Sequence, residues 1–76
     1  MTEPDLQYCG HALARMSRAG ISADEVYGIV RHPAWRRPSY AQRIEHHGYS
    51  DDGRHLRIVV EADESTVVTV VVEPFR

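Results

Sequence analysis

The residues best suited to catalysis gather near the N-terminus, where His11 is followed by Arg15 and Arg18. His11 and Arg15 are four positions apart, so on a helix they share one face, and Arg18 extends the same stripe. An imidazole can transfer protons near neutral pH, and the planar fork of a guanidinium suits a phosphate. The spacing therefore predicts a small nuclease site on a helix, or else a solvated helix face.

A second set of suitable side chains lies in the C-terminal half, where Arg54, His55 and Arg57 begin a β-rich segment. RNA cleavage without a metal ion requires a base for the 2′-hydroxyl, an acid for the leaving 5′-oxygen and cations for the phosphorane. Together with His11 and Arg15, these three residues supply the required types. Their separation along the chain leaves open whether the two sets meet in space.

Aromatic and cationic residues are also mixed at Trp35, Arg36, Arg37 and Tyr40. Surfaces that bind single-stranded nucleic acid combine such residues, because aromatic rings stack on bases and cations follow the backbone. This segment and Arg18 are therefore candidates for substrate binding. The alternative is a loop in which Trp35 fills the edge of the core and both arginines stay solvated.

The sequence predicts no metal site and no cofactor. His46 and His47 are adjacent, so on a strand they point to opposite faces and cannot chelate one ion together. Cys9 is the only cysteine, which leaves no internal disulfide and no thiolate zinc site. No glycine-rich phosphate loop and no serine or cysteine nucleophile motif is present.

Length and composition predict one domain over residues 1–76, with residues 1–8 as a short lead-in that is either frayed or one short extended piece. The formal net charge is −2, yet all nine cations are arginines and most lie in the middle of the chain. A local basic surface on a mildly acidic protein is therefore expected. No apolar stretch has the length of a membrane span and the N-terminus has no secretory signal, so we expect a cytoplasmic protein without membrane contact.

Two short helices are predicted in the N-terminal half. The first extends from about residue 9 or 10 to residue 19, with a glycine directly after it. Ser22 and Glu25 form a capping box that begins the second helix, and Pro33 ends it. Gly28, inside the second helix, is expected to let a neighbouring element approach closely.

The C-terminal half is predicted to be a small antiparallel sheet. Its strands cover residues 42–49, 55–61 and 66–73, and residues 35–40 form an edge strand or a loop because of Pro38. The turn before the last strand predicts three cross-strand pairs: Val60 with Val67, Ile58 with Thr69, and Leu56 with Val71.

This pairing leaves a second apolar face on the sheet. It is expected to carry Val59, Val68, Val70, Val72, His55, Arg57 and Glu61. One layer of two helices covers only one face of a sheet, so the second face is expected to meet another chain, a ligand or an extra strand. The alternative is a sheet that curls over part of its own surface.

The order of several short motifs resembles a small bacterial domain family that is related in pattern to BrnT-type toxins of the RelE/ParE superfamily. The motifs are His11-Ala-x-x-Arg15-Met16, Arg18-x-Gly20-Ile21-Ser22, Asp52-Gly53-Arg54 before Leu56-x-Ile58-Val59-Val60, and Val68-Thr69-Val70. The resemblance extends over residues 9–72. It implies an α+β fold with two N-terminal helices packed on an antiparallel sheet of three to four strands, preceded in many members by a strand that is weak or missing here.

The resemblance also implies a toxin that cleaves RNA without a metal ion and is neutralised by an antitoxin. His11, Arg15 and Arg54 match positions of the family pattern, and Arg57 is added from the residue types alone. In this hypothesis His11 is the general acid or base, and the three arginines bind the scissile phosphate.

Three alternatives remain open at this point. The domain could be a non-catalytic interaction module that dimerises or docks a partner through its valine-rich sheet face. It could be a DNA gyrase poison, since the superfamily includes such members. His11 and Arg15 could also be structural, with His11 bonded to strand backbone and Arg15 paired with Glu61 or Glu73.

Overall fold

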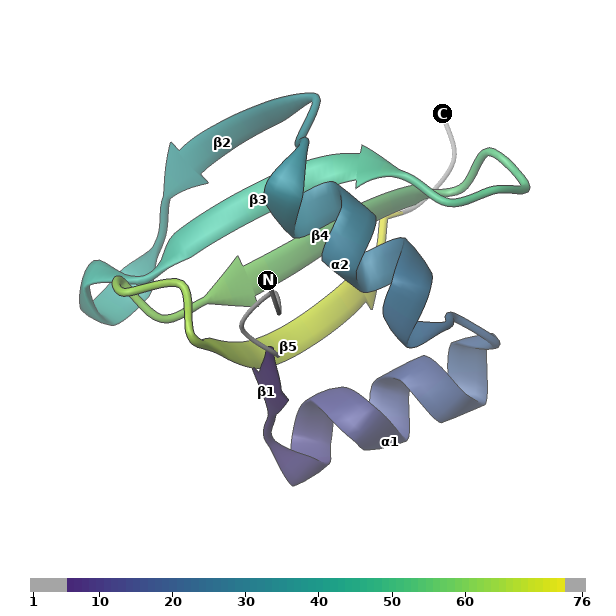
Figure 1. The fold of residues 1–76 in the computed structure, drawn as a ribbon, viewed down its shortest axis with the longest axis horizontal. Helices are drawn as coiled ribbons and strands as arrows, with labels where there is room; N and C mark the ends of the chain where they lie inside the picture. The colour runs from purple at the N-terminus through teal and green to yellow at the C-terminus, as the bar shows by residue number, and fades with distance from the viewer. Residues whose placement is uncertain (1–5, 74–76) are drawn as a thin grey trace, which may run out of the picture.

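Two helices and five strands make up the computed structural model, which describes residues 6–73 (Figure 1). A short 3-10 turn, η1, joins two of the strands. In chain order the elements are β1 (Gln7–Tyr8), α1 (Gly10–Ala19), α2 (Ala23–Arg31), β2 (Trp35–Pro38), η1 (Tyr40–Gln42), β3 (Ile44–Tyr49), β4 (His55–Val60) and β5 (Thr66–Val72). The predicted α+β class is confirmed, and each predicted helix and strand is present within about two residues of its expected bounds.

The strands form one mixed sheet in the order β1-β5-β4-β3-β2. β2 to β5 are antiparallel to their neighbours, whereas β1 pairs in parallel with the start of β5. The sheet therefore has five strands instead of the three to four predicted. Residues 1–8 were expected to be a frayed lead-in or one short extended piece. The two residues of β1 are such a piece, and they count as a strand because they pair with the edge of β5.

Local capping chemistry fixes both helices as predicted. Gly20 ends α1 in the left-handed conformation with φ 71°, and the N–H of Ile21 donates to Met16 O at 2.9 Å. Ser22 and Glu25 form the expected capping box at the start of α2, with the Glu25 N–H 3.1 Å from Ser22 Oγ. Two helices joined by so few residues must fold back on the same side of the sheet.

A β-bulge in β5 overturns two of the three predicted cross-strand pairs. Val60 pairs with Val67 as expected, but the register then shifts, so that Val59 lies opposite Thr69 and Ile58 opposite Val70. One extra residue moves every later side chain of β5 to the other face. Val70 was expected on the second face and is instead 1% exposed within the core.

Both helices pack on one face of the sheet and build a single core there. In Figure 1, α2 crosses in front of β3 and β4 while α1 extends alongside β5. The buried cluster consists of Ala12, Met16, Ile21, Val26, Ile29, Val30, Leu56, Ile58, Val60, Val67 and Val70. No helix of residues 6–73 lies on the opposite face, which we call the open face. Alternation along β2, β3 and β4 gives it Trp35, Arg37, Glu45, His47, Tyr49, His55, Arg57 and Val59.

Close approach of backbone to side chain occurs at Gly48, not at Gly28. A Cβ added to Gly28 would meet nothing within 4 Å, so the expectation for this residue was wrong. A Cβ on Gly48 would lie 2.9 Å from Ile29 Cγ1 and 3.0 Å from Ile29 Cγ2. The contact between α2 and β3 therefore depends on a glycine in the strand.

His46 is buried on the helix side of β3, where the core meets the turn between β4 and β5. Neither ring nitrogen has a hydrogen-bond partner within residues 6–73, and Glu64 Oε1 lies 3.7 Å from Nε2. Burial lowers the pKa of His46 below the 6.5 of an exposed histidine, while the charges of Glu64 and Arg36 act in opposite directions. The folded protein therefore favours the neutral ring.

We expect acidification to destabilise the fold through His46. As the pH falls below 6.5, the unfolded chain takes up this proton more readily than the folded protein, so the free energy of unfolding decreases toward the lowered folded pKa. His46→Leu removes this difference, so its melting temperature should fall less than that of the wild type between about pH 7.5 and 5.5. Identical slopes for the two proteins would contradict this account.

Candidate active site on the open face

Two histidines and a glutamate form a hydrogen-bonded chain on the open face. Glu45 and His47 are two residues apart on β3 and so share a face, and Glu45 Oε1 lies 2.9 Å from His47 Nε2. Nδ1 of His47 lies 2.9 Å from Nε2 of His55, the first residue of β4. The β3–β4 hairpin makes this meeting possible, because its register places Tyr49 opposite His55 and His47 opposite Arg57.

The order of the chain assigns its protons. Nε2 of His47 faces a carboxylate, so we place its proton there as a donor to Glu45. Nδ1 of His47 is then the acceptor of the hydrogen bond that Nε2–H of His55 donates. This tautomer leaves the lone pair on Nδ1 of His55, where it can accept a further proton.

Aromatic rings enclose the two histidines. The Trp35 ring stacks on His47 with centroids 4.8 Å apart and planes 10° apart, and it lies 5.2 Å from His55. The ring of Tyr49 packs against the ring of His55, with their centroids 5.6 Å apart. Trp35 is 40% exposed and Tyr49 is 57% exposed, so aromatic and hydroxyl groups remain available to a ligand above the chain. The alternative in which Trp35 fills the edge of the core is wrong.

Charges next to the chain keep Glu45 ionised. The hydrogen bond from His47 lowers the pKa of Glu45 most, and Arg57, whose Nη1 lies 3.7 Å from Glu45 Oε2, lowers it further. Arg57 Nε is also 2.6 Å from Glu73 Oε2, so its charge is shared between two carboxylates. Arg37 lies opposite Glu45 in register and forms no ion pair within residues 6–73, which makes it the cation of this face that can meet a phosphate.

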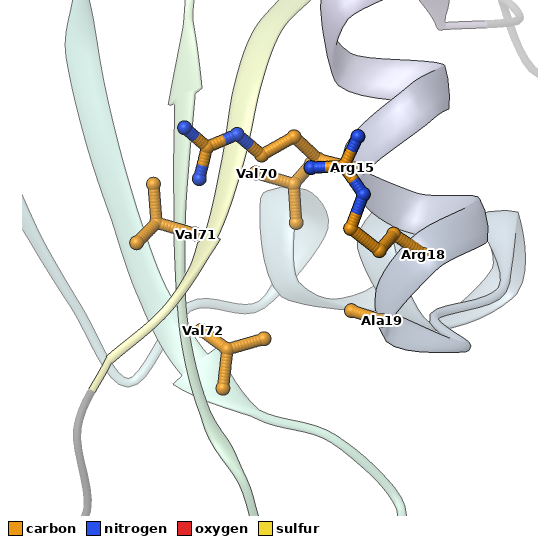
Figure 2. Close-up of a pocket in the computed structure, with 6 residues that line it drawn as sticks. All are labelled: Arg15, Arg18, Ala19, Val70, Val71 and Val72. Atoms are coloured by element: carbon orange, nitrogen blue, oxygen red, sulfur yellow. The ribbon is translucent and has the colours of Figure 1, made fainter.

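The predicted catalytic residues do not form one site. His11, Arg15 and Arg18 are exposed on α1, on the helix side of the sheet, whereas Arg57 points from the open face. Arg15 and Arg18 instead line a small pocket between α1 and the end of β5 (Figure 2). The structural alternative for Arg15 is also not found, because Glu61 is paired with Arg43 and Glu73 with Arg57.

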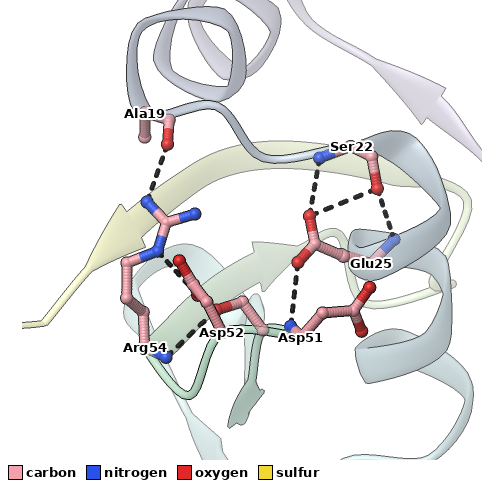
Figure 3. A network of polar contacts seen from close by, with 7 residues as sticks. Ala19, Ser22, Glu25, Asp51, Asp52 and Arg54 are labelled. Atoms are coloured by element: carbon pink, nitrogen blue, oxygen red, sulfur yellow. Dashed lines mark hydrogen bonds and ion pairs between the residues drawn. The ribbon is translucent and has the colours of Figure 1, made fainter.

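Arg54 is occupied in holding α1 to the β3–β4 turn (Figure 3). Its Nη1 donates to Ala19 O at the end of α1, 2.7 Å away, and its Nε donates to Asp52 Oδ1 at 3.0 Å. Its backbone N–H donates to Ser50 Oγ at 3.0 Å. In the same network, Glu25 accepts the backbone N–H of Asp51. These contacts give Arg54 a structural role that its position in the motif did not indicate.

Arg54→Ala is expected to lower the free energy of unfolding by about 1 kcal/mol, because the last carbonyl of α1 loses a charged hydrogen-bond donor. Urea denaturation of the variant and the wild type measures this difference. Arg18→Ala, which changes an exposed arginine in the last turn of α1, is the comparison for a general effect of charge. A folded Arg54→Ala protein of unchanged stability would contradict the structural role.

The two arginines of β2 point to opposite faces of the sheet. Arg36 lies 3.6 Å from Glu64 on the helix side, and Arg37 lies on the open face. Arg36, Arg37 and Arg43 also line a shallow pocket beside η1, and Arg43 is stacked on the Tyr40 ring at 4.9 Å. Of this segment, Trp35 and Arg37 therefore belong to the candidate site.

Of the three residues in the hydrogen-bonded chain, only His55 was indicated by the sequence. Glu45 was treated only as part of a strand, and His47 was considered only as a metal ligand, although their spacing of two already placed them on one face. The turn at residues 50–53 offered a second signal, because a short hairpin fixes which residues lie opposite one another. Within residues 6–73, no three His, Cys, Asp or Glu side chains are grouped as metal ligands would be.

Comparison with known proteins adds no identification. No protein-family model matches the chain, and no curated protein or solved structure is significantly similar to it. Within residues 6–73, the longest helix has ten residues, and no helix has the length and apolar character of a membrane span.

Proposed function

We propose that this domain cleaves single-stranded RNA without a metal ion, using the open face of its sheet. The observation that carries the proposal is the Glu45–His47–His55 chain, which ends in an imidazole nitrogen free to accept a proton. A carboxylate that orients one histidine, which in turn orients a second, is an arrangement suited to general base catalysis. The class of toxin that the sequence resembles performs the same chemistry.

The cleavage step needs one proton removed and one supplied. Nδ1 of His55 takes the proton of the 2′-hydroxyl, and the 2′-oxygen attacks the adjacent phosphorus. The bond from phosphorus to the 5′-oxygen breaks, and Tyr49, an exposed residue whose ring contacts that of His55, supplies a proton to that leaving oxygen. The products are a 2′,3′-cyclic phosphate and a free 5′-hydroxyl.

The remaining groups of the open face would bind the substrate. The exposed Trp35 ring can stack on a base, and such stacking is worth about 1–3 kcal/mol per base. Arg37 would contact the phosphate and stabilise the charge that develops on it. Arg57 is neutralised by Glu45 and Glu73, so it would hold the site together instead of binding the phosphate.

The biological setting of this proposal is that of a toxin–antitoxin pair in the bacterial cytoplasm. A ribonuclease must be restrained in the cell that makes it, and a dedicated protein partner is the simplest restraint. The resemblance of residues 9–72 to toxin domains supports this setting. The open face carries charged and aromatic groups beside its valines, so we assign it to RNA instead of to a homodimer.

The proposal is tested by incubating the purified protein with single-stranded RNA in EDTA and analysing the product ends by mass spectrometry. Cyclic phosphate ends are expected, together with no cleavage of single-stranded DNA of the same sequence. Intact RNA at micromolar protein, or products with 5′-phosphate ends, would overturn the proposal, because neither is compatible with attack by the 2′-oxygen.

A further inference from the structure

The outer edge of β5 is only partly covered by β1. β1 pairs with Thr66 and Val67 alone, and Cys9 Sγ contacts Val68 O at 2.9 Å. From residue 69 to residue 72, β5 has no strand neighbour on this side within residues 6–73. The N–H of Glu73 donates inward to His55 O, so alternation turns the backbone groups of Val70 and Val72 toward the outer edge.

The two edges of the sheet differ in how they resist further pairing. β2, at the opposite edge, carries Arg36, Arg37 and Pro38, and charged residues and proline commonly block strand addition. β5 has seven residues, none of them charged and none of them proline. The free part of β5 is therefore the edge that favours pairing with another strand.

Two arginines stand beside this free edge. Arg15 and Arg18 line one pocket of about 200 Å³ together with Ala19, Val70, Val71 and Val72. Figure 2 shows both guanidinium groups extending from α1 toward β5. Neither arginine forms an ion pair within residues 6–73, so both charges are available to an approaching anionic group.

We propose that residues 69–72 of β5 bind an extended segment of a partner protein, whose acidic side chains pair with Arg15 and Arg18. The partner strand would supply hydrogen bonds at Val72, which is 38% exposed, whereas Val70 is covered at 1% exposure. The carboxylates of the partner would meet the arginine forks. A second copy of this chain fits less well. Pairing β5 of two copies would bring Arg15 and Arg18 of both copies to one interface, and neither β5 strand carries a carboxylate to pair with them. This inference takes from the proposed function only that a protein partner exists.

The test uses a labelled peptide of alternating valine and glutamate, with a lysine-for-glutamate peptide as the matched control. We expect the acidic peptide to bind at least about tenfold more tightly and to slow amide exchange at the exposed Val72. Val72→Pro removes one outward N–H and should abolish binding of the acidic peptide, whereas Val72→Ala should retain it. The double variant Arg15→Glu, Arg18→Glu should reverse the preference between the two peptides.

Four results would overturn the inference. One is equal binding of the two peptides, and another is binding that Val72→Pro does not alter. A third is concentration-dependent dimerisation that protects the same amide, which would assign the edge to a second copy. The fourth is an RNA oligonucleotide that competes at Arg15 and Arg18 without protecting any β5 amide, which would make this a nucleic-acid surface. RNA cleavage is not a readout in any of these experiments, so this inference and the proposed function can fail separately.

Discussion

His55→Asn is expected to lower the rate constant of RNA cleavage by about 10²- to 10⁴-fold, the usual contribution of a general base. Asparagine retains a polar group beside His47 but cannot accept a proton at the position of Nδ1. The loss should appear in kcat, with little change in KM, because Trp35 and Arg37 remain in place to bind the substrate. Single-turnover cleavage of a labelled oligonucleotide measures the effect.

The matched control for this prediction is His11→Asn, the same change at the histidine of α1. His11 is exposed and lies on the other side of the sheet from His55, so this variant should cleave RNA at the wild-type rate. Circular dichroism and thermal melting establish that both variants are folded. If His11→Asn lost activity and His55→Asn kept it, the site would lie on α1, as the sequence first suggested.

Gly48→Ala is expected to lower the free energy of unfolding by about 2 kcal/mol, the middle of the range for an overpacked core. The added Cβ would lie 2.9 Å from Ile29 Cγ1 and 3.4 Å from Ile29 Cβ, so the clash is with the branched base of a side chain and not with a flexible tip. Relief requires α2 to move away from β3. Urea denaturation gives the change directly.

Two variants make this prediction specific to the contact with Ile29. In an Ile29→Ala background both Cγ atoms are gone, so Gly48→Ala should cost little, and the double-mutant cycle should show coupling of about 2 kcal/mol. Gly28→Ala, at a helix position with open space around it, should instead stabilise the protein by up to about 1 kcal/mol. Additive effects at Gly48 and Ile29 would show that the close contact does not exist in solution.

The parts of the fold that local chemistry determines could be predicted from the sequence. Ser22 and Glu25 begin a helix by satisfying its first amides, and Gly20 ends one because it adopts positive φ without strain. The bulge at Val68 and the parallel pairing of residues 7–8 with β5 could not be predicted in this way. Both depend on which backbone groups of β5 find a partner in the folded sheet, and a run of valines carries no signal of its register.

The same distinction between local features and strand pairing applies to the functional site. The spacing of His11 and Arg15 correctly predicted a shared helix face, because that spacing is a property of one helix. The site at His47 brings together Trp35 from β2, Glu45 from β3 and His55 from β4. Three strands must be in register before these side chains meet, so residue type alone indicated His55 and Arg57 as candidates but not the partners that give them a role.

The most direct test of the central claim is to map where RNA binds. A single-stranded oligonucleotide with 2′-deoxyribose throughout cannot be cleaved by the proposed reaction, so it can be titrated into ¹⁵N-labelled protein and followed by NMR. We expect the largest shifts at the Trp35 indole N–H and at the amides of Arg37, His47 and His55, with the amides of α1 unchanged. Shifts confined to His11, Arg15 and Arg18, or no shifts at all, would contradict an RNA-cleaving site on the open face.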